Sequence, residues 1–160
     1  MKTLEITVAV KTYSLGELDS GDRQLVLAAK KATERSYAPY SGFSVGAAAL
    51  LANGVVVTGT NQENVAYPSG LCAERTALFY AGSQYPDQPV VALAVAARTG
   101  GHFVDSPIPP CGACRQVMLE TEARHNRSFR LLLCGAREIY RIDRAADLLP
   151  LSFDGSAMEK

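Results

Sequence analysis

Apolar residues alternate with polar ones near the N-terminus and recur at helical spacing further along the chain. Four alternating apolar residues predict a short strand over residues 4–10 (Leu4, Ile6, Val8 and Val10). Helix-start residues at positions 19–22 precede apolar positions that recur from Leu25 towards Tyr37. The first third of the chain is therefore expected to hold a strand followed by a helix.

A turn signal lies between the next two apolar runs. The pair Asn53-Gly54 separates residues 45–51 from residues 55–60, and this pair favours the tight turn of a two-residue β-hairpin. These two runs are therefore expected to form neighbouring antiparallel strands.

The second half of the chain mixes helical and strand patterns. The pattern predicts, in order, a helix over 72–81, a buried strand over 90–97, a helix over 111–123, strands over 130–134 and 138–142, and a short helix over 145–149. Such an order implies a mixed sheet with helices on both faces.

Length and charge narrow the class of protein. The 160 residues suit one compact domain. The 16 Lys and Arg residues balance 16 Asp and Glu residues, which argues against a dedicated nucleic-acid binder. No apolar run approaches the roughly 20 residues that span a bilayer, and the N-terminus does not have the pattern of a signal peptide. We therefore expect a cytoplasmic protein, in which the four cysteines are reduced thiols, metal ligands or catalytic groups.

Two short motifs place three cysteines at the starts of predicted helices. They are Ser69-Gly-Leu-Cys-Ala-Glu-Arg75 and Pro110-Cys-Gly-Ala-Cys-Arg-Gln116. The unpaired N–H groups and the dipole at a helix N-terminus favour a thiolate over a thiol. Cys111 and Cys114 are one helical turn apart, and Cys72 would come from the second helix. Three thiolates can hold one zinc ion and leave a fourth position open for water.

A carboxylate follows the first of these cysteines. Glu74 is too near Cys72 in sequence to reach round the metal easily, so it can lie beside the open position. Zinc lowers the pKa of bound water towards about 7, and a carboxylate there can take the proton. The general signature of zinc deaminases has this form, with three cysteines as one variant and a glutamate that does not ligate the metal.

Several segments together resemble the free-nucleoside cytidine deaminases. Besides the two cysteine motifs, they are Ala38-Pro-Tyr-Ser-Gly-Phe-Ser-Val-Gly-Ala47, Asn61-Gln-Glu-Asn-Val-Ala-Tyr-Pro68 and Asp147-Leu-Leu-Pro150. The resemblance runs from about Ser36 to Phe153. It implies an α/β fold, a three-layer α/β/α sandwich with a mixed sheet of about five strands, and one zinc ion per subunit. It also implies a homotetramer with shared active sites that acts on a small nucleoside, with no nucleic-acid or membrane partner.

The resemblance also implies residue roles and a reaction. Cys72, Cys111 and Cys114 would hold zinc, and a zinc-bound hydroxide would attack C4 of cytidine or deoxycytidine. Glu74 would carry protons to N3 and then to the ammonia that leaves. Substrate contacts are expected from a pyrimidine-packing phenylalanine, two ribose-binding residues and two neighbours of the site (Phe43, Asn61, Glu63, Tyr67 and Ala73). Arg75 would offset the charge of the thiolates, and Phe153 would close the site of a neighbouring subunit.

Some parts of the chain depart from the family pattern. We divide it into an N-terminal extension over 1–20, a deaminase domain over 21–153 and a tail over 154–160. The extension is expected to be either an extra strand or an arm, and the segment 100–109 is a few residues longer than the family needs. Phe153 is equally compatible with a lid and with ordinary core, because the tail after it does not follow the family.

Other interpretations of the same residues remain open from the sequence. A Cys-X-X-Cys pair at a helix start also occurs in thioredoxin-type redox proteins, although these need neither Cys72 nor Glu74. A closed structural zinc site would require a fourth ligand from Cys134, His102 or His125. Three other functions also remain open. The protein could be a deaminase for modified nucleosides of the blasticidin type, an editor of polynucleotides, or a zinc-binding module without catalysis.

Overall fold

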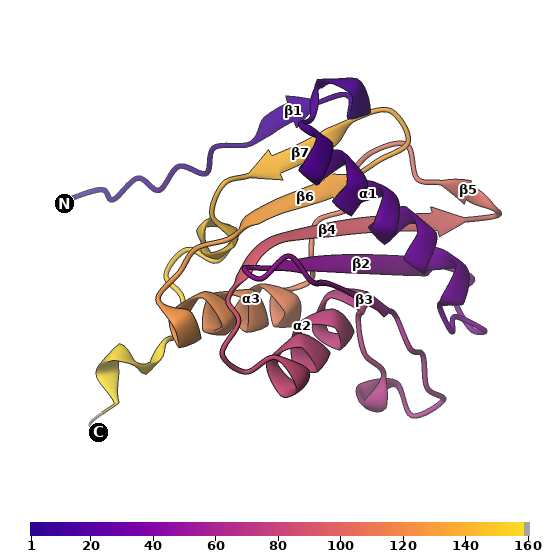
Figure 1. The fold of residues 1–160 in the computed structure, drawn as a ribbon. Coiled ribbons are helices and arrows are strands. Elements are labelled where there is room, and N and C mark those ends of the chain that lie inside the picture. Colours follow the sequence, from indigo (N-terminus) through magenta and orange to yellow (C-terminus); the bar gives the residue numbers. More distant parts are fainter. Residues whose placement is uncertain (159–160) are drawn as a thin grey trace.

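A central mixed sheet lies between one long helix on one face and two on the other (Figure 1). The computed structural model describes residues 1–158. Its helices are α1 (Ser20–Ala32), α2 (Ala73–Gln84) and α3 (Gly112–His125). Its strands are β1 (Lys11–Tyr13), β2 (Ser44–Leu51), β3 (Val56–Thr60), β4 (Val90–Thr99), β5 (His102–Phe103), β6 (Arg130–Cys134) and β7 (Ile139–Ile142). The predicted three-layer α/β/α sandwich is confirmed.

The sheet has the order β1-β7-β6-β4-β2-β3, with β5 paired to the end of β4. Strands β4 and β6 are parallel, and α3 forms the crossover between them, whereas the remaining pairs are antiparallel. The sheet has seven strands where about five were expected. The two additional strands, β1 and β5, are three and two residues long, too short for an apolar pattern to reveal.

Alternating residues of the central strands face the two helical layers. Ala94 and Ala96 of β4 belong to the cluster that packs on α1, whereas Leu93 and Val95 belong to the cluster that packs on α2 and α3. Small residues face α1, so this helix can lie close to the sheet. The continuous apolar run of β4 is thus explained by burial on both faces.

Two predictions near the N-terminus are wrong: one predicted strand is absent, and one predicted helix ends earlier than expected. Residues 4–10 form no strand; they are mostly exposed, and pairing with β7 begins only at β1. Helix α1 ends at Ala32 and passes into a short 3-10 turn rather than reaching Tyr37. Tyr37 instead forms an isolated bridge with Gln62, just after β3.

The predicted hairpin of β2 and β3 is confirmed, but its turn is longer than two residues. Residues 52–55 connect the strands, and the register of β2 against β4 shifts between Leu50 and Leu51. Gly54 has a φ of +87°, a left-handed conformation that glycine adopts without the steric cost of a side chain. The predicted helix at 145–149 is likewise replaced by a 3-10 turn, η4 (Ala145–Leu148).

Close packing of β3 against α2 positions the first cysteine motif. A Cβ atom added to Gly59 would lie 2.4 Å from the backbone nitrogen of Ala77, so only glycine lets this strand and helix approach so closely. Helices α2 and α3 lie side by side on one face of the sheet (Figure 1).

Two further points concern membrane spans and the division of the chain. Among residues 1–158, no helix is both long and apolar enough to cross a membrane. The division into extension, domain and tail stays a prediction, and the last two residues of the tail, 159 and 160, lie outside the described residues.

Candidate metal centre

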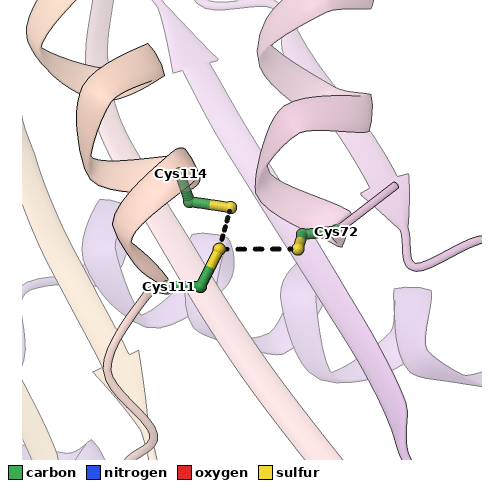
Figure 2. A group of neighbouring side chains, drawn as sticks. All are labelled: Cys72, Cys111 and Cys114. Carbon is green, nitrogen blue, oxygen red and sulfur yellow. Dashed lines mark hydrogen bonds between the residues drawn. The ribbon is translucent and has the colours of Figure 1, made fainter. Parts of the chain in front are cut away.

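Three cysteine sulfurs converge between the starts of α2 and α3 (Figure 2). The Sγ atom of Cys111 lies 3.7 Å from that of Cys72 and 3.5 Å from that of Cys114. All three sulfurs lie within 4.8 Å of one another. A disulfide needs a sulfur–sulfur distance of about 2.05 Å, so these are three separate thiols.

This spacing suits a tetrahedral metal ion. With zinc–sulfur bonds of about 2.3 Å, tetrahedral geometry places two sulfur ligands roughly 3.8 Å apart. The two sulfur separations, 3.7 and 3.5 Å, lie close to that value. Within residues 1–158, no fourth cysteine, histidine or carboxylate joins the cluster. The donor set therefore fits a zinc ion held by three protein ligands with one position left for a small molecule.

The helix starts explain why these sulfurs meet. Cys72 is the N-cap of α2 and Cys111 is the N-cap of α3, and neither side chain caps its own helix. Cys114 lies in the first turn of α3 and is fully buried. The N-terminal dipoles of the two helices therefore act on the same cluster and favour negative charge on sulfur.

A guanidinium reinforces this effect. The Nη2 atom of Arg75 lies 3.7 Å from the sulfur of Cys72. Hydrogen bonding from the Cys114 thiol, together with Arg75, lowers the pKa of Cys72 from 9.0 to about 5, whereas sharing a proton with Cys72 raises the pKa of Cys114. Within the described chain, the Nε atom of Arg75 is the only buried side-chain nitrogen or oxygen that has no hydrogen-bond partner.

A buried carboxyl group borders the same cluster. Glu74 is only 5% exposed, and this burial raises the pKa of its carboxyl group above the ordinary value of 4.5. The negative charge of Cys72 raises the pKa further. Glu74 is thus poised to hold a proton beside the sulfurs rather than to stay ionised at all times.

A cavity of about 400 Å³ opens next to the cysteines. Its lining includes Cys72, Cys111 and Glu74, together with Glu63 and Tyr67. Its remaining lining residues are Val45, Asn61, Gly70, Leu71, Ala73, Arg75, Ile108 and Pro109. The predicted residues Asn61, Glu63, Tyr67, Ala73 and Arg75 are therefore brought together with the metal centre.

A second hollow, of about 290 Å³, shares Glu63 and Tyr67 with the first. Tyr40, Ser41 and Asn64 complete its lining, and the rings of Tyr40 and Tyr67 meet edge to face at 6.3 Å. A molecule with its reacting end at the cysteines could therefore extend past Glu63 towards these aromatic rings.

Residues 19–127 match the family described as the cytidine and deoxycytidylate deaminase zinc-binding region. The chain belongs to this family. A cytidine deaminase from Sporosarcina psychrophila is 43% identical over 81% of this chain and 89% of its own. A cytidine deaminase from Halalkalibacterium halodurans is 52% identical over 62% of this chain and 71% of its own.

Solved structures support the same assignment. The structure of cytidine deaminase from Burkholderia pseudomallei superposes with a TM-score of 0.68 at 44% identity, covering 81% of this chain and 97% of that chain. Cytidine deaminase from Mycobacterium tuberculosis gives a TM-score of 0.65 at 37% identity, over 85% and 99% of the two chains. The deaminase fold therefore extends over most of this chain.

Two other predicted substrate residues lie outside the cavity. Phe43 is half-buried and does not line it, although the Phe43 backbone is held by Asn61. Phe153 is 68% exposed and does not line the cavity of its own chain. Their proposed roles as a pyrimidine contact and as a lid stay predictions.

Asn61 and Glu63 hold the segment that carries Phe43. The side-chain amide of Asn61 donates to the Phe43 carbonyl at 2.9 Å, and its oxygen accepts from the N–H of Val45 at 2.8 Å. The carboxylate of Glu63 accepts from the backbone of Tyr40 at 2.9 Å and from the Ser41 hydroxyl. Hydrogen bonding from Ser41 lowers the pKa of Glu63, so this carboxylate stays ionised.

Four apolar residues of the cavity wall were not predicted from the sequence: Val45, Leu71, Ile108 and Pro109. Ile108 and Pro109 belong to the proline-rich stretch just before Cys111, so their nearness to a ligand was the available signal. Leu71 immediately precedes Cys72 and offered the same signal. Val45 gave no such signal, because an apolar residue near the start of a strand such as β2 is typical of ordinary core.

The three candidates for a fourth zinc ligand lie elsewhere. Cys134 is fully buried in the cluster under α1, and this burial raises its pKa to about 12. His102 belongs to β5, and His125 is the last residue of α3, at the opposite end from Cys114. The arrangement therefore disfavours a closed structural zinc site.

Proposed function

We propose that this protein hydrolyses cytidine and deoxycytidine to uridine and deoxyuridine with release of ammonia. The observation that carries the proposal is the cluster of three cysteine sulfurs at tetrahedral spacing beside a cavity that also contains the buried Glu74. Membership of the deaminase family and the names of its relatives agree with this activity.

The cysteines and their neighbours would hold one zinc ion per subunit. Cys72, Cys111 and Cys114 would be its ligands, and the dipoles of α2 and α3 together with Arg75 would offset the charge of three thiolates. When bound, the ion would supply a Lewis acid that lowers the pKa of a coordinated water molecule.

Glu74 carries the protons of the reaction. One carboxylate oxygen takes a proton from the attacking water and delivers it to the pyrimidine N3, which makes C4 more electrophilic. Once the water oxygen is bonded to C4, the same group moves the second proton of that water to the exocyclic nitrogen, so that the C4–N bond breaks and ammonia leaves. Burial of Glu74 supports this role, because bulk water is kept away from its proton.

The part of the cavity lined by Asn61 and Glu63 suits the sugar of a nucleoside. Glu63 can accept hydrogen bonds from ribose hydroxyls, and Asn61 can both donate and accept. Both residues also hold the segment of Phe43, so sugar binding and placement of this ring on the pyrimidine would be linked. Ala73 and Tyr67 complete the walls around the base and the sugar.

The lining favours a nucleoside over a nucleotide. Among residues 1–158, Arg75 is the only basic residue that lines either hollow, and it is directed at Cys72. The two acidic residues, Glu63 and Glu74, would repel a phosphate group. The hollow beside the tyrosine pair leaves room for a substituent beyond the sugar, so modified nucleosides of the blasticidin type are the second candidate substrates.

We further propose a cytoplasmic homotetramer with shared active sites. Phe153 is exposed and lies away from the cavity of its own chain, so it is free to close the site of a neighbouring subunit. Reducing conditions in the cytoplasm would keep the three zinc-binding thiols from forming disulfides. Light scattering of the purified protein measures the subunit number directly.

One experiment tests the activity. Ultraviolet spectroscopy and ammonia release are followed for cytidine, deoxycytidine, cytidine 5′-phosphate, adenosine, blasticidin S and a cytosine-containing oligonucleotide, with zinc quantified on the same sample. We expect turnover of the two free nucleosides at about one zinc per chain. Bound zinc without turnover of any substrate would instead indicate a non-catalytic module, and turnover of the oligonucleotide alone would indicate an editor.

A further inference from the structure

Arg115 links the loop before the second cysteine motif to the C-terminal part of the chain. Its Nε atom donates to the carbonyl of Pro110 at 2.9 Å, and its Nη1 atom donates to the carbonyl of Leu148 at 2.9 Å. Pro110 immediately precedes Cys111, whereas Leu148 lies 33 residues beyond Arg115, at the end of η4. One side chain thus joins two segments that are distant in sequence.

Arg115 occupies a position in α3 where the nearby helix dipole disfavours a positive charge. It lies in the first turn of α3, where the helix dipole repels positive charge. A planar guanidinium can direct two N–H groups at two separate carbonyls, whereas lysine presents a single nitrogen on a flexible stem. Arg115 does not stabilise the start of α3, because its charge opposes the helix dipole. Its presence there is better explained by its hydrogen bonds to two carbonyls.

The next residue anchors the same C-terminal segment. The side-chain Nε2 atom of Gln116 donates to the carbonyl of Phe153 at 2.9 Å. Between the two anchored carbonyls, Leu151 has a φ of +53°, a left-handed conformation that is strained for a residue with a side chain. Leu151 is 86% exposed, so packing of its side chain does not hold this conformation. The anchors at Leu148 and Phe153 instead define the path of the segment.

We propose that Arg115 is a positioning residue of the metal centre, which fixes the Pro110–Cys111 loop against the segment 148–153. The inference rests on the proposed zinc site, but it concerns a residue that neither ligates the metal nor lines the cavity. Without the two hydrogen bonds, the loop would become more mobile at Cys111. The protein would then release zinc faster. Gln116 would fix only the far end of the segment, near Phe153.

The test is the rate at which zinc leaves the protein for an excess of a chromophoric chelator, measured without nucleoside. For Arg115→Ala we expect release on the order of 10 to 100 times faster than for the wild type, the usual size of effects from groups that orient metal ligands. Arg115→Lys, which can bond one carbonyl at a time, should fall between the two. Substitution of cobalt for zinc should show a shifted visible spectrum for Arg115→Ala, because the sulfur geometry changes.

Two matched variants separate this role from general damage. Gln116→Leu removes the neighbouring anchor at Phe153 but leaves Pro110 bonded, so zinc release should stay within about twofold of the wild type. Arg127→Ala removes an exposed arginine after α3 and should likewise release zinc at the wild-type rate. Arg115→Ala should also lower the melting temperature of the zinc-loaded protein more than that of the zinc-free protein, because only the loaded form loses metal-binding energy.

Each outcome either supports or overturns the proposal. Wild-type zinc release by Arg115→Ala, or release by Gln116→Leu as fast as by Arg115→Ala, would overturn it. Equal losses of melting temperature with and without zinc would show a merely structural role and would also overturn it. If Arg115→Ala does not fold, zinc release from Arg115→Lys at the wild-type rate would overturn the proposal as well. Failure of the proposed deaminase activity would appear separately, as wild-type protein that retains zinc without turning over cytidine.

Discussion

Arg75 directs its Nη2 atom at the sulfur of Cys72 across 3.7 Å, from the first turn of α2, the helix whose N-cap position is Cys72. We predict that Arg75→Gln raises the pKa of the Cys72 thiol above about 5 in the zinc-free protein, because one source of positive charge is removed. Thiolate absorbance in the ultraviolet, followed against pH, measures the shift. Arg127→Gln is the control, and superimposable titrations of the wild type and Arg75→Gln would contradict the prediction.

Replacing Glu74 should separate metal binding from catalysis. We predict that Glu74→Ala retains about one zinc per chain but loses turnover of cytidine by about 10²- to 10⁴-fold, the usual contribution of a general acid–base group. Zinc content and steady-state rates on the same sample provide the measurement. Glu120→Ala, an exposed change on α3, should leave both unchanged. A rate like that of the wild type in Glu74→Ala would refute the proposed proton carrier.

The double hydrogen bond of Asn61 should matter for both stability and substrate binding. Asn61→Ala leaves the Phe43 carbonyl and the Val45 N–H without their side-chain partner, so we expect the free energy of unfolding to fall by about 1–3 kcal/mol. The KM for cytidine should rise more than kcat falls. Urea denaturation and kinetics test this, with Gln62→Ala as the control, since Gln62 bonds through its side chain only to Thr60. A variant as stable as the wild type would show that these two hydrogen bonds do not stabilise the fold.

Glu122 should make stability depend on pH. Burial raises its pKa above 4.5, against the lowering effect of hydrogen bonds from the backbone N–H groups of Phe129 and Ala145 and of the charge on Arg144. The folded state therefore binds this proton more tightly than the unfolded chain does. The contribution of Glu122 to stability is fully present below pH 4.5 and is lost as the pH rises through the raised pKa.

Glu122→Gln removes this titration, so the wild type should lose stability relative to the variant as the pH rises through that window. Urea denaturation at a series of pH values from about 4 upward measures the difference between the two free energies of unfolding. Groups that titrate equally in both proteins cancel in this difference. A difference that stays constant across the series would show that the carboxyl group titrates alike in the folded and unfolded states.

Removal of the metal should affect activity and stability together. A chelator that strips zinc should abolish turnover of cytidine, and added zinc should restore it, whereas added Mg²⁺ should not, because thiolates select zinc over magnesium. At zinc concentrations about 1,000 times the dissociation constant, bound metal stabilises the folded state by about 4 kcal/mol. Calorimetry with and without chelator measures this loss. Full activity of protein proven free of metal would exclude the proposed chemistry.

Local sequence patterns predicted an element correctly where interactions within a short segment determine its structure. The helix starts at Cys72 and Cys111, the buried strand β4 and the hairpin of β2 and β3 follow from spacing, capping position and turn residues, and all are present. The strand predicted over residues 4–10 is absent because alternation shows only that a segment could be a strand, and no neighbouring strand pairs with it. The short strands β1 and β5 were missed for the complementary reason, since their neighbours rather than their residues define them.

The amino-acid sequence by itself determined the chemistry available to this protein: three thiols at helix starts, a carboxylate two residues after the first, and motifs that identify the family. Only the tertiary structure decided which groups meet. The Cys111 sulfur lies 3.7 and 3.5 Å from the sulfurs of Cys72 and Cys114, Asn61 and Glu63 hold the segment of Phe43, and Arg115 reaches Leu148. The reason is that sequence spacing constrains contacts within one or two turns of a helix. Contacts between distant segments depend on how the sheet and its helical layers pack.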